Sequence, residues 1–328
     1  MPLKILIIKP SSLGDIVHTL PAVGAIRDAN PDAEITWVIN PEWAPLLRGN
    51  PDIDHVHFFP RGELSGFGAP VRLLSWMRET RRLQPDVVVD FQGLLRSALI
   101  AKVSGAAKIF GMSDAREGSR FFYTEIARVD RNEHAVDRYL KLAKRFGAPL
   151  PEELRFPIPS GDPLPRFDRF PAFVLLHPYA RGRNKSMRTD VILEFCRALA
   201  PARVVVVGKS NRRFSTPENC VDLTNQTSLL QLIWLLRAAA SVVSVDSGPM
   251  HVAAAVTTNL VSIHTRTDPR RVGPYNKAAS IWKNGKLVRV ADLESSDDLG
   301  KKGRNFVPED VSPVADFALR VLANQPLL

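Results

Sequence analysis

The sequence predicts an α/β protein made of two Rossmann-like domains that face a central cleft. Three observations support this prediction. Short runs of apolar, β-branched residues alternate with helix-like segments along the chain. A proline-rich stretch interrupts the alternation near the middle, and the order of strand, polar loop and helix recurs on both sides of it. Runs that are apolar almost throughout indicate strands buried on both faces, which is typical of a parallel sheet.

The chain has 328 residues, of which 45% are hydrophobic, enough to bury the cores of two domains. Eight apolar runs bounded by polar or turn-forming residues are predicted to be strands. They cover residues 3–9, 34–40, 55–59, 86–90, 172–177, 202–208, 241–245 and 260–264. Helices are predicted between them, among others over residues 18–29, 188–200 and 228–240.

A linker is predicted between Gly147 and Pro171. This interval contains seven prolines and no helical period, and proline at such density disfavours regular helices and strands. We therefore expect an N-terminal domain over residues 1–148, a linker over 149–171 and a C-terminal domain over 172–328. Rossmann-like sheets bind ligands beyond the carboxyl ends of their strands, so the polar loops at these ends are the candidate functional segments.

The net charge restricts the classes of partner. The chain carries 44 basic and 34 acidic residues, a formal net charge of +10 at pH 7 and a pI of about 9.8. A generally basic soluble protein, an anionic substrate or an acidic membrane surface would each account for this balance. Nucleic acid fits least well, because no basic and aromatic recognition motif occurs.

Other features favour a cytoplasmic protein. Cys196 and Cys220 lack the spacing of a disulfide framework or a zinc site and are interpreted as core thiols. Residues 1–12 become polar too soon for a signal peptide and are typical of a first strand. No apolar run reaches the roughly 18 residues that span a bilayer. We expect a cytoplasmic protein that can still bind a membrane surface.

The segment SVVSVDSGPMHVAAA, residues 241–255, raises the most specific question. A buried strand and a helix that starts near a proline leave Asp246, Ser247 and Gly248 in the turn between them. Glycine admits a close ligand, and the N–H groups at a helix start attract phosphate. The alternative is an ordinary helix cap by Asp246 or Ser247. A serine-hydrolase elbow is disfavoured, because the required glycine before the serine of G-x-S-x-G is missing.

The loop IIKPSSLGDIVHTLP, residues 7–21, follows the first predicted strand. It contains Ser11, Ser12 and Gly14, and Asp15 lies just before an apolar helix. The loop matches neither a P-loop nor G-x-G-x-x-G. Asp15 is interpreted either as a helix-terminal charge, stabilising by about 0.3–1 kcal/mol, or as a general base at the mouth of the cleft.

A third loop, PYARGRNKSMRTD, covers residues 178–190. Four basic residues gather there between a strand end and a helix, namely Arg181, Arg183, Lys185 and Arg188. They are interpreted either as a solvated basic loop or as a clamp for a departing phosphate.

Metal chemistry has little support in the sequence. Asp52-Ile53-Asp54 resembles the D-x-D of metal-dependent sugar transferases, but it lies in a turn before a strand and is interpreted as turn chemistry. The seven histidines show no ligand spacing such as H-E-x-x-H. We expect no bound metal and no cofactor.

Taken together and in this order, the motifs resemble the bacterial lipopolysaccharide heptosyltransferase family, glycosyltransferase family 9. The first loop is most similar to that of heptosyltransferase I. The motifs that carry the resemblance are KPSSLGDIVHTLPA (9–22), DFQGLLRSAL (90–99), DAREGSRFFY (114–123), HAVDRYL (134–140), VDSGPMHVAAA (245–255) and TDPRRVGPY (267–275). They cover nearly the whole chain.

The resemblance implies a GT-B fold and an inverting, metal-independent transfer of heptose from ADP-heptose to Kdo-lipid A at the inner membrane. Asp15 matches the family's catalytic base, and Lys185 matches the lysine that faces the nucleotide's phosphates. The implied nucleotide-sugar-binding residues are Arg181, Asp246, Ser247, Gly248 and His251. The implied acceptor-binding residues are Ser11, Ser12, Gly14, Gln92 and Arg116.

The sequence departs from the family pattern in three places. The acidic residue that contacts the ribose is missing from GKSNRR, residues 208–213. Thr265-Arg266 replaces the usual Gly-Pro before Thr-Asp-Pro, and Met187 replaces the usual tryptophan after the lysine. Two alternatives therefore stay open: a related transferase that uses another nucleotide sugar, and a GT-B protein that binds nucleotide without catalysis.

Overall fold

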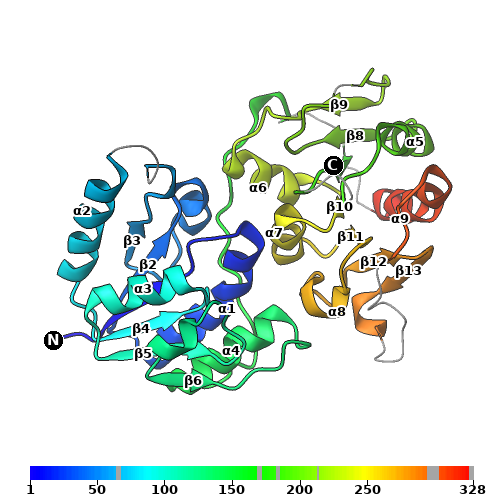
Figure 1. The fold of residues 1–328 in the computed structure, drawn as a ribbon. Coiled ribbons are helices and arrows are strands. Elements are labelled where there is room, and N and C mark those ends of the chain that lie inside the picture. The colour runs from blue at the N-terminus through cyan, green and yellow to red at the C-terminus, as the bar shows by residue number, and fades with distance from the viewer. Residues whose placement is uncertain (64–67, 168–171, 182–184, 213, 294–302, 325–328) are drawn as a thin grey trace. The chain divides into compact units, whose positions relative to one another are not determined.

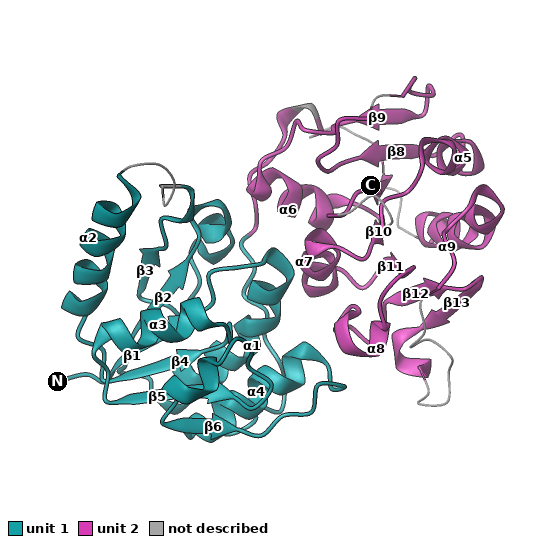
Figure 2. Cartoon of the chain, viewed as in Figure 1, with its two compact units in different colours: residues 1–159 teal, residues 160–328 magenta. Residues whose placement is uncertain are grey.

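The computed structural model describes residues 1–63, 68–167, 172–181, 185–212, 214–293 and 303–324. The chain forms two compact units, unit 1 over Met1–Pro159 and unit 2 over Ser160–Leu328 (Figure 2). Each unit contains one β-sheet with helices on both of its faces (Figure 1). Among the described helices, none combines the length and the apolar character needed to cross a bilayer.

The sheet of unit 1 is parallel throughout, with the strand order β3-β2-β1-β4-β5-β6. Its strands are β1 (Lys4–Ile8), β2 (Glu34–Ile39), β3 (His55–Phe58), β4 (Val87–Asp90), β5 (Lys108–Met112) and β6 (Glu125–Ala127). The direction of winding reverses between β1 and β4. In Rossmann-like sheets this reversal marks the ligand-binding edge.

Helices cover both faces of the sheet of unit 1. They are α1 (Leu13–Ala29), α2 (Ala69–Arg82), α3 (Leu95–Ser104) and α4 (Ala135–Phe146), with 3-10 helices η1 (Pro41–Leu47), η2 (Arg61–Glu63) and η3 (Ser119–Phe122). Helix α1 packs against α4, whereas α2 packs against α3, and α3 against η3 (Figure 1). The central strands are buried because both of their faces are covered, and Leu6, Ile8, Val38 and Val88 are completely inaccessible, whereas the edge strand β3 is largely exposed.

The sheet of unit 2 has the order β13-β12-β11-β10-β7-β8-β9, and only the pairing of β12 with β13 is antiparallel. Its strands are β7 (Phe173–His177), β8 (Arg203–Val206), β9 (Cys220–Asp222), β10 (Ser241–Val245), β11 (Leu260–Ile263), β12 (Ser280–Lys283) and β13 (Lys286–Arg289). Its helices are α5 (Thr189–Leu199), α6 (Leu229–Ala238), α7 (Gly248–Val256), α8 (Pro269–Val272) and α9 (Val311–Ala323), with 3-10 helices η4 (Pro165–Phe167), η5 (Val290–Asp292) and η6 (Pro308–Asp310).

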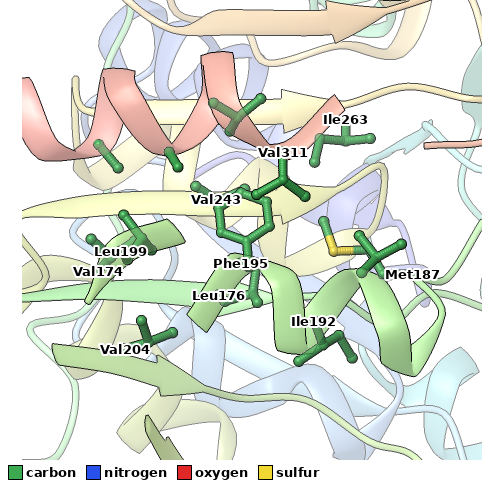
Figure 3. Close-up of a cluster of buried hydrophobic side chains, with 14 of the residues drawn as sticks. Val174, Leu176, Met187, Ile192, Phe195, Leu199, Val204, Val243, Ile263 and Val311 are labelled. Atoms are coloured by element: carbon green, nitrogen blue, oxygen red, sulfur yellow. The ribbon is translucent and has the colours of Figure 1, made fainter. Parts of the chain in front are cut away.

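The core of unit 2 lies between its sheet and the helices α5 and α9. Phe195 of α5 and Val311 of α9 pack with Leu176 and Val243 of the central strands, and all four side chains are at most 1% exposed (Figure 3). This core fixes β7 and β10 as neighbours, so the loops that follow these two strands lie at the same edge of the sheet.

The predicted α/β class with two Rossmann-like domains is confirmed, and each of the eight predicted strands is present. The helix predicted over residues 18–29 starts earlier, at Leu13, because Ser12 and Asp15 form a capping box there. Gly248, predicted to lie in a turn, is the first residue of α7. Sequence analysis missed β5, β6, β9, β12 and β13.

The proline-rich segment 149–171 divides between the two units, and its residues 168–171 lie outside the described part of the chain. Arg155 donates hydrogen bonds to Asp28, Asp52 and the carbonyl of Gly24 within unit 1. In unit 2, Phe167 packs against Phe173 and Trp234.

Candidate functional site

In unit 1, the loops that follow β1 and β4 lie next to each other, because the two strands are neighbours with Ile8 opposite Asp90. A direct bond ties the loops together: the ammonium of Lys9 donates to the carbonyl of Phe91 at 2.8 Å. Asp15 lies in the first turn of α1, the helix that follows the β1 loop, and Gln92 lies in the loop after β4. The structure therefore brings the predicted base into the neighbourhood of a predicted acceptor-binding residue.

Asp15 is held firmly in the first turn of α1. Its Oδ2 accepts hydrogen bonds from the hydroxyl of Ser12 at 2.6 Å and from the backbone N–H of Ser12 at 3.1 Å. The helix N-terminus favours the ionised form of a carboxyl group. Asp15 is therefore both a helix-capping residue and a carboxylate in a defined position that can accept a proton.

Lys9 lies behind this carboxylate and is only 3% exposed. Its ammonium also donates to the hydroxyl of Tyr139 of α4 at 2.8 Å. Burial by itself would lower the pKa of Lys9, but interactions with Tyr139, Asp15 and Asp90 outweigh burial and raise that pKa above its usual value. Burial also raises the pKa of Tyr139, so the phenol stays protonated. Lys9 is thus a buried cation, and sequence analysis did not single it out.

Asp90 shapes the loop that carries Gln92. Its carboxylate accepts hydrogen bonds from Ser97 Oγ at 2.7 Å, Tyr123 Oη at 2.8 Å and the backbone N–H of Gln92 at 2.9 Å. Complete burial raises the pKa of Asp90 despite these bonds. The side chain of Gln92 itself has a buried Oε1 that accepts no hydrogen bond from the described residues. Buried oxygens without a partner are rare in folded proteins, which marks the Gln92 loop as a candidate binding segment.

The other sequence motifs of unit 1 converge on the same loops. The backbone N–H of Arg116 donates to the carbonyl of Gly93 at 2.9 Å, which places Arg116 beside Gln92. The Arg116 side chain is exposed. Arg138 forms an ion pair with Asp114, which attaches α4 to the Arg116 loop.

A basic groove opens at the edge of this sheet, around β6 and the end of α4. Its volume is about 1150 Å³. Ten residues line it, namely Ser113, Arg120, Thr124, Glu125, Ile126, Ala127, Arg128, Lys141, Lys144 and Arg145. Five of these side chains are basic and one is acidic, so the groove favours an anionic group.

In unit 2, Asp246 follows β10 and meets Lys185 from the loop after β7. The ammonium of Lys185 lies 2.6 Å from Asp246 Oδ2, and Thr267 Oγ1 donates to the same oxygen at 2.7 Å. Lys185 is still 32% exposed along its side chain, so it can also contact a ligand. Of the four predicted basic residues, Arg181 is exposed in the same loop, Arg188 pairs with Asp190, and Arg183 lies outside the described residues.

The charge on Asp246 depends on Lys185. Burial would raise the pKa of Asp246, but His264, Lys185 and Thr267 together hold it below its usual value. Burial lowers the pKa of His264 to about 4, so this imidazole is neutral at pH 7. Lys185 therefore supplies the positive charge beside Asp246 near neutral pH.

The half-buried Thr267 and the buried Ser262, His264 and Lys283, none of them predicted from the sequence, hold this ion pair in place. Thr267 Oγ1 lies 3.0 Å from His264 Nδ1, and Ser262 Oγ lies 3.1 Å from His264 Nε2. Because Thr267 donates to Asp246, Nδ1 of His264 carries the proton and Nε2 accepts from Ser262. Lys283 donates to the carbonyl of Thr267 at 2.6 Å. Thr267 is the first residue of the motif TDPRRVGPY, but nothing in that motif indicated that Thr267 donates a hydrogen bond to Asp246.

Helix α7 starts directly after this cluster. Ser247 occupies its N-cap position, yet the Ser247 side chain makes no capping hydrogen bond. The hydroxyl of Ser247 instead lies 3.3 Å from Nδ1 of His177, and Asp246 is bound to Lys185 and Thr267. The alternative of an ordinary cap by Asp246 or Ser247 is therefore wrong. His251 lies one turn further along α7 and is buried.

The described residues contain no group of three or more His, Cys, Asp or Glu side chains placed to hold a metal ion. Both carboxylates of the Asp52-Ile53-Asp54 segment are paired with arginine: Asp52 with Arg155 and Asp54 with Arg27. These two carboxylates act in ion pairs of unit 1.

Comparisons with known proteins agree with the motifs. The family model described as glycosyltransferase family 9 (heptosyltransferase) matches residues 73–302. Lipopolysaccharide heptosyltransferase 1 of Pseudomonas aeruginosa is 30% identical and covers 84% of this chain and 82% of its own length.

Two solved structures from E. coli share the fold of this chain. One is the ADP-heptose lps heptosyltransferase II, with a TM-score of 0.74, 20% identity and coverage of 98% of this chain and 99% of its own. The other is heptosyltransferase WaaC with ADP, with a TM-score of 0.71, 23% identity and coverage of 85% and 92%. The predicted GT-B fold class is confirmed.

Proposed function

The chain belongs to glycosyltransferase family 9, the heptosyltransferases, and we propose that it transfers a heptose from ADP-heptose to Kdo-lipid A, the inner core of lipopolysaccharide. One observation carries the donor half of this proposal: the N-cap residue Ser247 makes no side-chain capping bond at the start of α7, and the ammonium of Lys185 lies 2.6 Å from Asp246, the residue directly before Ser247. Uncapped N–H groups beside a cation suit a diphosphate.

The donor's diphosphate would bind at Ser247 and Gly248, with Lys185 neutralising its charge. Asp246 positions the lysine, since the two groups are 2.6 Å apart. Gly248 has an ordinary helical backbone, so the value of glycine there is the absence of a side chain where phosphate approaches. Arg181 of the loop after β7 and His251 of α7 would complete the nucleotide-sugar site.

The acceptor would bind to unit 1. Ser11, Ser12 and Gly14 directly precede Asp15 in the chain, and Gln92, whose buried Oε1 has no hydrogen-bond partner among the described residues, would bind a sugar hydroxyl. Kdo and phosphate groups are anionic, and the basic groove at β6 and the exposed Arg116 suit such charges.

The reaction we propose is a direct displacement. Asp15 removes the proton from an acceptor hydroxyl, whose oxygen attacks the anomeric carbon of the heptose. The bond from that carbon to the phosphate oxygen breaks, ADP leaves, and the configuration at the anomeric carbon inverts. Base catalysis contributes typically about 10²–10⁴-fold, and Lys185 with the α7 N–H groups stabilises the departing phosphate charge.

We propose that no metal takes part, since Lys185 and the helix start neutralise the diphosphate. The enzyme would work at the cytoplasmic face of the inner membrane, because its acceptor is a lipid and its net charge of +10 favours an anionic surface.

A transfer assay tests the proposal. Purified protein receives Kdo-lipid A with ADP-heptose, a UDP-hexose or a GDP-hexose, each with and without EDTA, and mass spectrometry follows the acceptor. We expect one added heptosyl unit with ADP-heptose only, at the same rate in EDTA. Transfer from another donor would assign the sugar differently, and activity lost in EDTA and restored by Mg²⁺ or Mn²⁺ would refute the metal-independent mechanism. ADP binding without any transfer would favour a non-catalytic protein.

A further inference from the structure

Exposed apolar side chains are distributed unevenly between the two units. Among the described residues, every large hydrophobic side chain that is more than a third exposed belongs to unit 1. Six of them lie on α2, α3 and η3, and we call this surface the α2–α3–η3 face: Val71, Leu73, Leu74, Leu95, Leu99 and Phe121. Val71 is 73% and Phe121 is 93% exposed, which is unusual for side chains that gain nothing from water.

The three elements are neighbours, because α2 packs against α3 and α3 packs against η3. Helical spacing separates the two sides of α2. Trp76 and Thr80 are buried toward the sheet, whereas Val71, Leu74 and Arg78 recur at intervals of three and four residues on the outer side. Leu95 and Leu99 of α3 are also one turn apart.

The same elements are strongly basic. They carry one acidic residue, Glu79, and seven exposed basic residues, namely Arg72, Arg78, Arg81, Arg82, Arg96, Lys102 and Arg120. On α2 the outward apolar residues occupy the first half and the outward arginines the second half. Outward-pointing apolar side chains among arginines match an anionic lipid surface: apolar groups enter the headgroup region, and guanidinium groups bind lipid phosphate.

The position of the face suits a lipid substrate. Helix α3 begins at Leu95, three residues after Gln92, and the backbone N–H of Leu95 donates to Glu117, which follows Arg116. The candidate acceptor loops therefore border the face directly. A bilayer lying on the face would present the headgroup of a lipid next to these loops.

We propose that the α2–α3–η3 face docks the protein on an anionic bilayer. The membrane contact is a property of this face alone, whereas its use in delivering the acceptor rests on the function proposed above. No spanning segment is needed, and the contact is reversible and weakens with salt.

Vesicle sedimentation tests the face with variants on its outer side. The probes are vesicles of phosphatidylcholine alone and of phosphatidylcholine with phosphatidylglycerol. The charge variant Arg78→Gln/Arg82→Gln removes two positive charges, and we expect its partition to anionic vesicles to fall about 30-fold, equivalent to about 1 kcal/mol per charge. The apolar variant Val71→Asp/Leu74→Asp should fall at least tenfold.

Matched controls change similar residues away from the face. Lys286→Gln/Arg289→Gln removes two exposed charges from β13 of unit 2, and Leu150→Asp changes an exposed leucine outside the α2–α3–η3 elements. Both should bind vesicles within about twofold of the wild type. The melting temperatures of all variants should be close to that of the wild type, since the altered side chains are exposed.

A second readout separates docking from catalysis. With a deacylated, water-soluble acceptor, Val71→Asp/Leu74→Asp should transfer heptose at the wild-type rate. If no protein transfers heptose, the proposed function fails while the vesicle result still decides the docking.

Unchanged vesicle binding by both variants, or equal wild-type binding to neutral and anionic vesicles, would overturn the proposal. So would a wild-type dimer in ultracentrifugation that the variants convert to monomers, because the face would then join two copies of the chain.

Discussion

Replacing Asp15 tests the base and the helix cap at once. Asp15→Asn keeps a side-chain oxygen for Ser12 but cannot take a proton. Asp15→Ala removes the carboxylate with both of its bonds to Ser12, at 2.6 Å and 3.1 Å. The two variants should therefore lose the same activity and different amounts of stability.

The magnitudes follow from the contacts. Loss of the base should lower kcat by about 10²–10⁴-fold in both variants. Two hydrogen bonds at about 0.5–1.5 kcal/mol each predict that Asp15→Ala lowers the free energy of unfolding by about 2 kcal/mol. Asp15→Asn keeps the bonding position but loses the interaction of its charge with the helix terminus, about 0.3–1 kcal/mol, and the attraction of that charge to the buried Lys9. ADP affinity should be almost unchanged, because the base acts on the acceptor.

The assays are kcat at saturating substrate, ADP calorimetry and urea unfolding. The capping box of α6 supplies a matched control: Gln231 Oε1 accepts from the N–H of Ser228 at 2.9 Å, as Asp15 does from Ser12. Gln231→Ala should lower stability by about 1 kcal/mol and leave transfer intact. If Asp15→Asn keeps more than about a tenth of the wild-type kcat, the base lies elsewhere.

Three further predictions concern other residues. Gly248→Val should weaken ADP binding at least tenfold by placing a branched side chain at the diphosphate, whereas Ser247→Ala should cost about 0.5–1.5 kcal/mol of binding; calorimetry showing unchanged affinity in Gly248→Val would mean that the segment only turns the chain. Lys9→Met should lower the free energy of unfolding by about 3–5 kcal/mol, because it leaves the buried Asp90 and the neighbouring Asp15 without their cation; a loss below about 1 kcal/mol in urea unfolding would contradict that reasoning. Burial lowers the pKa of His177 to about 4, against about 6.5 in the unfolded chain, so the stability it contributes is complete above about pH 6.5 and is lost as the pH falls toward 4. Between pH 7 and pH 4 the wild type should therefore lose about 3 kcal/mol more than His177→Gln, and equal losses would refute the assignment.

The sequence was sufficient for the strands that are buried on both faces. A strand covered by helices on both sides is apolar at most of its positions, so β1, β4, β7 and β10 stand out from the polar loops around them. Polar residues directly after such strands identified Asp15, Asp246 and Ser247 as candidates, because ligands bind at that edge. The basic loop after a predicted strand identified Lys185, and the family motifs added Gln92 and Arg116.

The sequence was insufficient where a neighbour from elsewhere in the chain decides the structure. Strand β5 contains Gly111, which disfavours a strand by its local preference. The ring of Tyr123 lies where a side chain at residue 111 would stand, at 2.2 Å from the position of its Cβ, so only glycine fits. Cys196 and Cys220 are 24 positions apart in the sequence, yet both lie in the same buried cluster of unit 2.

What the sequence by itself determined is the order of strands, loops and helices and the residue types at each strand end. What only the tertiary structure decided is which strand ends meet. Strands β7, β10 and β11 are neighbours in the sheet, and therefore Lys185, Asp246 and Thr267 form one hydrogen-bonded group although 61 residues separate the first two. The same pairing turns Asp246 and Ser247 away from capping α7. Local sequence favoured a cap. A buried carboxylate, however, is stabilised more by a nearby cation and a hydroxyl than by a single helix N–H. For Asp246 that cation is Lys185, which lies in the loop after the neighbouring strand β7.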